Sequence, residues 1–273
     1  MKTSVIIPSK GGKFLEYVLK SLSSQTIKPE EVILVLKDCD TRKFEEITAQ
    51  QGLRGVIIEQ QKGFITHALN LGKKEASYEL ILFTDDDVIL PSHWIENYLK
   101  LFKQVEKTVG CVSSRDVYFD LKNKRKVKTP DDYLYVKAFR SFVRPLLDPP
   151  HPKLKKYRFG SYISKRYNFV FGKGIPNKNC YSLPFRGVNM GFRKEAIEEI
   201  KFIEHPEIRR GFRYEQHLGI QLLLLGYDSV YYPANPVLHI IRESLSRTKK
   251  IEELKKEEEI IKGEIIRLLQ MER

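Results

Sequence analysis

The sequence has few of the features that mark secreted, metal-clipped or membrane-spanning proteins. Its 273 residues include only three cysteines, which lie far apart and form no C-x-x-C pair, so a disulfide framework and a cysteine metal clip are excluded. No apolar run approaches the roughly 20 residues that cross a bilayer. The apolar run after Lys2 ends at Pro8 and is too short for the core of a signal peptide. These absences predict a cytoplasmic protein with reduced thiols.

Acidic residues are in the minority, and the basic excess is concentrated in one segment. The chain has 48 Lys and Arg against 35 Asp and Glu, a formal charge of +13. Residues 115–178 contain 17 Lys or Arg and five Asp, a net charge of +12, together with 12 of the 30 aromatic residues. The rest of the chain is close to neutral. Attraction to an anionic partner should therefore be centred on this middle segment.

The amino-terminal part of the chain alternates between short apolar strands and amphipathic helices. Hydrophobic residues make up 41% of the sequence, enough to form a core and to exclude intrinsic disorder. The alternation predicts an α/β fold, with a mainly parallel central sheet covered by helices and ligands bound beyond the carboxyl ends of the strands. The predicted strands cover residues 3–8, 31–36, 55–59, 79–84 and 109–113, and the predicted helices cover residues 14–22, 65–75 and 91–105.

Four segments are expected along the chain. Residues 1–114 contain the alternating strands and helices, and residues 115–182 form a basic aromatic insert of loops and short helices. Residues 183–245 return to regular structure, with a helix at 215–225 and a strand at 229–232. Residues 246–273 form a charged amphipathic helix.

The final helix has an apolar stripe that needs a cover. Glu258 interrupts this stripe, which makes a long coiled coil less favourable. The chain's own domain and a second copy of the chain are the two candidate covers, and the second would make an oligomer. The stripe consists of Ile251, Leu254, Ile261, Ile265 and Leu268.

The sharpest chemical signal is the run Asp85-Asp86-Asp87, which directly follows the predicted strand at 79–84. Three adjacent carboxylates repel one another unless a cation lies among them. Mg²⁺ binds one or two carboxylates and completes its shell with phosphate oxygens and water, so the run indicates a site for a nucleoside diphosphate. The alternative is an acidic loop whose Asp residues cap the following helix.

Several motifs in a fixed order resemble a known family. They are SVIIPSKGG, EEVILVLKDCD and GFITHALNLGKKEASYELILFTDDDVILP, followed by RGVNMGFRKEAI, YEQHLGIQLLLLGY and YYPANPVLH. Together they resemble the family 2 glycosyltransferases, which have the GT-A fold. The resemblance implies an inverting transfer of a sugar from a nucleotide-diphosphate donor, with Mn²⁺ or Mg²⁺ as cofactor.

The resemblance implies that residues 1–114 are the nucleotide-sugar-binding half and residues 183–245 the acceptor and catalytic half. It also assigns the nucleotide side of the site. Pro8 and Ser9 would lie in the nucleotide pocket, although a strand-ending turn accounts for them equally well. Asp38 would bind the base or the ribose, with Asp40 as the alternative. The stretch at residues 10–12, Lys-Gly-Gly, departs from the aromatic-Asn-Arg sequence that is common in the family.

For the acidic run, the resemblance implies that Asp85 faces the nucleotide sugar and Asp87 the metal, while Asp86 serves either. His239 ends a P-x-x-x-V-x-H pattern and would be a second metal ligand; its alternative is a structural role. The sequence does not distinguish Mn²⁺ from Mg²⁺.

On the acceptor side, Glu215 stands where the family has its general base, an Asp, with Leu218-Gly219 at the matching distance. A carboxylate there would take the proton of the attacking acceptor hydroxyl. The alternative is a Glu that stabilises the start of a helix through the macrodipole. Asn189 would orient a sugar or acceptor hydroxyl, or would simply occupy a turn.

The function that we predict is a metal-dependent inverting glycosyltransferase with an unknown glycan or lipid-linked acceptor. The basic aromatic segment predicts peripheral contact with the anionic inner face of a membrane. One alternative is a nucleic-acid-binding protein in which this segment contacts phosphates and stacks on bases. Another is a glycosyltransferase-like protein that binds sugars without catalysis.

Overall fold

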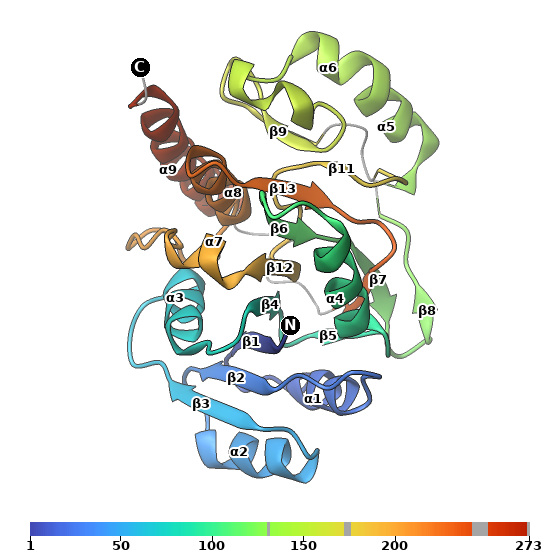
Figure 1. The fold of residues 1–273 in the computed structure, drawn as a ribbon, viewed down its shortest axis with the longest axis vertical. Helices are drawn as coiled ribbons and strands as arrows, with labels where there is room; N and C mark the ends of the chain where they lie inside the picture. The colour runs from blue at the N-terminus through green and yellow to red at the C-terminus, as the bar shows by residue number, and fades with distance from the viewer. Residues whose placement is uncertain (130–131, 172–175, 242–250, 272–273) are drawn as a thin grey trace.

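The computed structural model describes residues 1–129, 132–171, 176–241 and 251–271. Its centre is an eight-stranded mixed sheet with helices on both faces (Figure 1). The strands of this sheet, given in chain order, are β1 (Thr3–Ser9), β2 (Glu31–Leu36), β3 (Gly55–Glu59), β4 (Leu80–Thr84), β6 (Val109–Ser113), β11 (Cys180–Tyr181), β12 (Asn189–Arg193) and β13 (Asp228–Tyr231).

The prediction of a mainly parallel sheet covered by helices is confirmed. Strands β4, β1, β2 and β3 are parallel neighbours, and so are β6 and β13. Strand β12 runs antiparallel between β4 and β6, and β11 pairs antiparallel with β13 at the edge. Every residue of β1, β2, β4, β6 and β12 is buried, because helices cover both faces.

Alternate residues of β1, β2 and β4 belong to two separate cores. In β1, Val5 and Ile7 pack with α1 and α4 on one face, whereas Ile6 packs with α3 and α8 on the other, as the two-residue period of a strand requires. Helix α2 was not predicted; Asp40 begins it, accepting hydrogen bonds from the backbone N–H groups of Arg42 and Lys43. The helices are α1 (Leu15–Ser23), α2 (Thr41–Gln50), α3 (Ile65–Glu75), α4 (Trp94–Gln104), α7 (Lys194–Glu198) and α8 (Tyr214–Leu224).

A second, four-stranded sheet consists of strands that the sequence pattern did not predict. Its order is β5 (Val88–Ile89), β14 (Val237–Ile240), β7 (Asp116–Asp120) and β8 (Arg125–Lys126). Strand β14 lies between β5 and β7, so that His239 pairs with Val88 on one side and Tyr118 on the other. Pairing across more than 100 residues thus places His239 next to the acidic run.

The rest of the basic insert lies at the end of the molecule opposite α2 and β3 (Figure 1). Its helical segments α5, η2 and α6 follow one another without a break. Strands were not expected here, but a short antiparallel hairpin is present. The elements are α5 (Leu134–Ala138), the π-helical turn η2 (Phe139–Val143), α6 (Arg144–Leu147), the 3₁₀ segment η3 (Pro152–Tyr157), β9 (Ser161–Ile163) and β10 (Phe169–Phe171).

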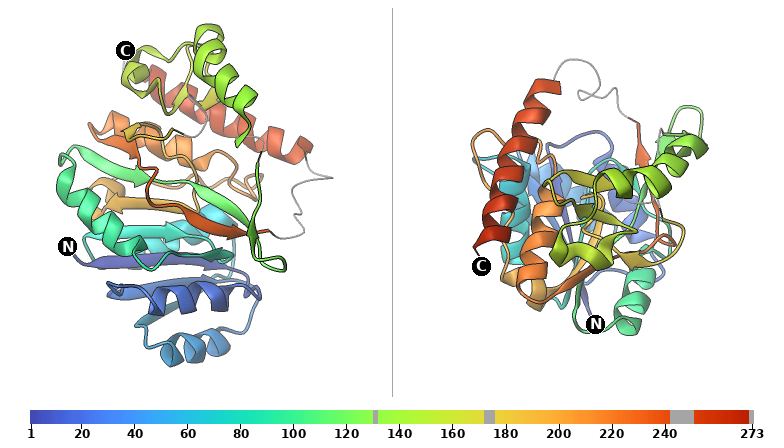
Figure 2. Two further views of the ribbon diagram at one scale, coloured as in Figure 1. Left: turned by 90° about the vertical axis from the view of Figure 1, so that its right-hand side faces the viewer. Right: turned by 90° about the horizontal axis from the view of Figure 1, so that it is seen from above.

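The final helix, α9 (Ile251–Gln270), packs against α8 of its own domain (Figures 1 and 2). Ile261 and Ile265 are fully buried, as predicted, but the buried stripe continues through Leu269 and Glu257 rather than through Ile251 and Leu268. Residues 246–250 and 272–273 of the predicted helix lie outside the described residues. Within the described residues, every helix is too short or too polar to span a bilayer.

Candidate active site

Beyond the carboxyl ends of β1 and β4, a cavity of about 650 Å³ collects most of the predicted site residues. This is the edge at which parallel α/β sheets bind ligands. Residues from α8 and β14 share its wall with the acidic run, although they lie more than 100 residues after that run in sequence. Among the lining residues are Pro8, Asp85, Asp86, Asp87, Asp116, Arg186, Arg213, Glu215 and His239.

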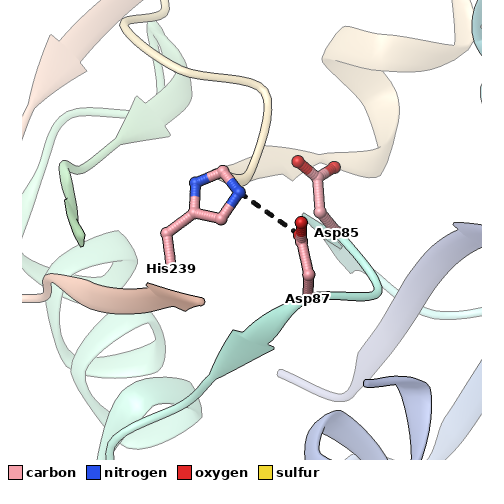
Figure 3. A group of neighbouring side chains, drawn as sticks. All are labelled: Asp85, Asp87 and His239. Atoms are coloured by element: carbon pink, nitrogen blue, oxygen red, sulfur yellow. Dashed lines mark ion pairs between the residues drawn. The ribbon is translucent and has the colours of Figure 1, made fainter. Parts of the chain in front are cut away.

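Asp85, Asp87 and His239 form a group that fits a divalent cation (Figure 3). One ligand atom of each residue lies within 4.8 Å of the others. The Nε2 atom of His239 is 3.3 Å from Oδ1 of Asp87. Two carboxylates and one imidazole make a donor set that suits Mn²⁺, because oxygen ligands favour Mn²⁺ and Mg²⁺ and imidazole favours transition metals.

The charges of this group support the same fit. Burial raises the pKa of Asp85 to about 7, and the negative charge of Asp87 adds to this effect. Burial alone would lower the pKa of His239, but its hydrogen bonds to Asp116 and Asp87 outweigh burial and raise that pKa to about 11. Protons on these two residues therefore relieve the crowding of carboxylates. A divalent cation among them would relieve it in the same way.

Asp116 belongs to the site but was missed by the sequence analysis. Its Oδ2 atom lies 2.9 Å from Nδ1 of His239, and its Oδ1 atom lies 3.4 Å from Nε of Arg186. Burial would raise the pKa of Asp116, but His239 and Arg186 lower it below the usual value. A carboxylate on Nδ1 fixes the ring and directs Nε2 toward Asp87. The signal was the position of Asp116 just after a predicted strand, at the same sheet edge as the acidic run.

Glu215 lies in the first turn of α8 and lines the same cavity. Its Oε1 atom accepts a hydrogen bond of 2.9 Å from the backbone N–H of Gly187. A side chain at Gly187 would clash with the hydroxyl of Tyr214, so glycine is required for this close approach. Burial raises the pKa of Glu215, and the nearby Arg213 and Arg186 only partly oppose the effect.

A smaller cavity of about 240 Å³ adjoins the first, and Pro8, Ile65 and Asp86 line both. Ser9 lines this smaller cavity. Its hydroxyl donates a hydrogen bond of 2.5 Å to Asp86 and accepts one of 3.0 Å from the backbone N–H of Gly11. Other lining residues were not predicted from the sequence; they include Lys37, Gln60, Phe64 and Arg209.

Asp38 and Asp40 line neither of these two cavities. Asp38 follows β2 with a left-handed backbone, φ 56°, and Asp40 uses its carboxylate as the N-cap of α2. The basic side chain of Lys37, rather than either carboxylate, reaches the smaller cavity. The predicted contact of Asp38 or Asp40 with the nucleotide stays a prediction, with both carboxylates outside the lining of the two cavities.

The predicted acceptor contact of Asn189 is also at odds with the structure. Asn189 is fully buried, and its Oδ1 atom accepts from Trp94 Nε1 and the Tyr98 hydroxyl. Its Nδ2 atom donates to the carbonyl oxygens of Arg115 and Asn235. All four hydrogen-bonding positions of the amide are thus used within the fold, and Asn189 braces the wall behind the cavity.

Comparison with known proteins identifies the fold. The family model described as Glycosyl transferase family 2 matches residues 4–201. The structure is similar to TarS from S. aureus in complex with UDP-GlcNAc, with 17% identity, a TM-score of 0.60 and coverage of 96% of this chain and 65% of that chain. It is also similar to the mannosyltransferase PcManGT from Pyrobaculum calidifontis in complex with GDP-Man and Mn²⁺, with 18% identity, a TM-score of 0.57 and coverage of 90% and 58%.

These structural likenesses show the GT-A fold, as predicted. The chain spans less than two thirds of the length of either solved structure. A search of curated proteins found no significant match.

Proposed function

The chain belongs to glycosyl transferase family 2, and we propose that it transfers a sugar from a nucleotide-diphosphate donor to an acceptor hydroxyl, with inversion at the anomeric carbon. One observation carries the proposal: a single cavity contains both the Asp85, Asp87 and His239 group and the carboxylate of Glu215. A single displacement needs stabilisation of the leaving diphosphate on one side and a base for the attacking hydroxyl on the other. The complexes of TarS with UDP-GlcNAc and of PcManGT with GDP-Man and Mn²⁺ support this class of donor.

On the donor side, Asp85, Asp87 and His239 would hold Mn²⁺ or Mg²⁺, with Asp116 orienting the imidazole. When bound, the cation would neutralise charge that develops on the leaving diphosphate. Asp86 and Ser9 border the smaller cavity, which we assign to the nucleoside.

On the acceptor side, Glu215 takes the proton of the acceptor hydroxyl while the oxygen bonds to the anomeric carbon and the bond to the diphosphate breaks. The Gly187 N–H holds Oε1 of Glu215, and the raised pKa of the carboxyl makes it a stronger base than an exposed glutamate. The Glu side chain is longer than the Asp of the family, and the hydrogen bond from the Gly187 N–H keeps its carboxylate close to the backbone.

For the acceptor, we propose a glycan or lipid-linked hydroxyl at an anionic membrane surface. The insert supplies Phe171 to the cavity wall beside Arg186 and Arg213, and it carries almost all of the net positive charge. We do not favour the alternative of a nucleic-acid-binding protein, because it does not explain why Glu215 and the acidic run line the same cavity.

The test is binding and turnover with a panel of sugar nucleotides, each with Mn²⁺, with Mg²⁺ or with a chelator. We expect at least one donor to bind by calorimetry only when a divalent cation is present, and to be hydrolysed slowly without acceptor. Binding of none of the panel, or binding unaffected by chelation, would contradict the donor and metal assignments. A product in which the sugar keeps the anomeric configuration that it had in the donor would contradict inversion.

A further inference from the structure

The helical segment at residues 133–147, formed by α5, η2 and α6 with Tyr133 before them, exposes an unusual number of large apolar side chains. It contains eight of the sixteen exposed large hydrophobic residues found in the described part of the chain. Leu134 is 84% exposed, Phe142 74% and Leu146 82%. The eight residues, here called the apolar face, are Tyr133, Leu134, Tyr135, Phe139, Phe142, Val143, Leu146 and Leu147.

The orientation of this segment is the reverse of an ordinary surface helix. Tyr135, Phe139, Phe142 and Leu146 follow the spacing i, i+4, i+7 and i+11, which forms one stripe, and this stripe faces solvent. The half-buried positions between them are mostly polar: Val136, Lys137, Arg140, Ser141, Arg144 and Pro145. A surface helix normally buries its apolar stripe. Each large apolar side chain left in water forgoes the free energy that its burial would release, so the stripe is suited to a cover outside this chain.

The charge around the apolar face indicates what that cover is. The segment 115–178 has a net charge of +12, and the exposed basic residues of the β7–β8 hairpin lie along the same side of the molecule as α5 (Figure 1). A second copy of the chain would bring two strongly positive surfaces together. An anionic bilayer instead offers an apolar layer beneath negative headgroups, which attract Lys and Arg side chains, and aromatic rings favour the headgroup boundary.

The helical segment is also fixed to the wall of the active-site cavity. It ends at the buried Asp148, whose carbonyl oxygen accepts from the Tyr162 hydroxyl of β9 and whose Oδ1 accepts from Asn168. Strand β10, which pairs with β9, continues to Phe171 in the cavity wall. A surface bound at the apolar face would therefore stand in a defined position relative to the cavity.

We propose that residues 133–147 are a membrane-docking helix that lies flat in the headgroup layer of an anionic bilayer, with the apolar face toward the acyl chains. This inference deepens the membrane contact proposed above and names the residues that make it. A helix of this length, about 20 Å, is an interfacial element and does not span the bilayer.

The experiment is co-sedimentation with vesicles of phosphatidylcholine alone or with phosphatidylglycerol, at low and high salt. The variant Phe142→Ser/Leu146→Ser removes apolar area at two highly exposed positions, where substitutions affect stability little. Ile251→Ser, an exposed apolar position in α9, is the matched control. We expect the full chain to bind vesicles with phosphatidylglycerol, the double variant to bind at least tenfold more weakly, and Ile251→Ser to bind like the full chain.

A second variant tests the charge. Replacing Lys122, Lys124 and Lys126 with Gln should weaken binding and reduce its salt dependence. Equal binding to both kinds of vesicle, absence of binding, or binding by the double variant equal to that of the full chain would overturn the proposal. A dimer in sedimentation that the double variant dissociates would identify a second copy as the cover, and would overturn it as well.

Hydrolysis of the soluble donor keeps this test separate from the proposed function. The double variant lies outside the cavity, so its hydrolysis of a sugar nucleotide in solution should equal that of the full chain. Loss of vesicle binding with intact hydrolysis supports the docking helix, whereas vesicle binding without any donor turnover contradicts the proposed function alone.

Discussion

Glu215 is the residue whose chemistry is most open to a direct test. Glu215→Gln keeps the shape and the acceptor for the Gly187 N–H but cannot take a proton, so turnover should fall about 100-fold or more. Donor affinity, measured by calorimetry with Mn²⁺, should change little. An equal loss of donor affinity would show that Glu215 serves the nucleotide side or the fold.

The pH dependence of the same residue provides a second prediction. A general base must be deprotonated, and burial raises the pKa of Glu215 above its ordinary value of 4.5. The acid limb of the kcat/KM profile should therefore lie above pH 4.5, with activity lost as the pH falls through it. An acid limb at or below pH 4.5, for a profile measured with saturating metal, would contradict the assignment of Glu215 as the base.

Substitution of Asp87 should reduce metal binding more than substitution of Asp116. Asp87→Asn removes a proposed ligand and should abolish metal-dependent donor binding. Asp116→Asn only weakens the support of His239, and the usual loss for such a partner is about 10- to 100-fold in metal affinity. Titration of Mn²⁺, monitored by its electron paramagnetic resonance signal, measures both. Full Mn²⁺ affinity in Asp87→Asn would exclude it as a ligand.

At the scale of elements, α9 fixes a loop of the cavity through one buried carboxylate. Glu257 is 1% exposed and accepts hydrogen bonds from the backbone N–H groups of Arg209, Arg210 and Phe212. Arg210 and Phe212 line the larger cavity, and Arg209 lines the smaller one. The sequence analysis named Glu258 as the acidic residue that interrupts the apolar stripe. In the structure the buried acidic residue of the stripe is Glu257, and its carboxylate holds this loop.

Glu257→Ala should therefore destabilise the protein and reduce its activity together. Three backbone donors lose their acceptor, and each unsatisfied buried group costs about 1–3 kcal/mol, less where water reaches the loop. Thermal unfolding and donor hydrolysis measure the two effects. The exposed Glu259 on the same helix is the control, since Glu259→Ala should leave both unchanged. Equal melting temperatures for the two variants would contradict the role of Glu257.

The elements that could be predicted from the sequence are those whose signal is local. Strand β3 and helix α3 match their predicted bounds, because their apolar spacing lies within a few consecutive residues. Strands β5, β7 and β14 were missed, since each pairs with a segment that is distant in sequence. Asp116 was missed for the same reason, because it begins β7. Asn189 was predicted to contact the acceptor because no local pattern in the sequence shows that it is buried behind the cavity wall.

At the scale of the whole molecule, the site joins two halves of the chain. The family match ends at residue 201, but Glu215 and His239 lie beyond it and reach the same cavity as the acidic run. The antiparallel strand β12 brings the second half onto the edge of β4, next to Asp85. Catalytic competence should therefore depend on the integrity of the entire fold.

The stability of the entire fold should itself depend on pH through His217. This residue lies on α8 and is buried, and burial lowers its pKa to about 4, whereas an unfolded His titrates near 6.5. As the pH falls below about 6.5, the unfolded state takes up a proton that the folded state resists, so the free energy of unfolding decreases until about pH 4. From pH 7 to pH 5 this contribution amounts to about 2 kcal/mol.

Replacing His217 with Gln removes that contribution, so the difference in unfolding free energy between the full chain and His217→Gln should shift by about 2 kcal/mol between pH 7 and pH 5. Comparing the two proteins cancels the titration of the active-site groups, which both contain. Urea unfolding at the two pH values measures the shift, and His93→Gln, at an exposed His, should not reproduce it. A pH-independent difference between the full chain and His217→Gln would mean that His217 is protonated to the same extent in the folded and unfolded states, which its burial argues against.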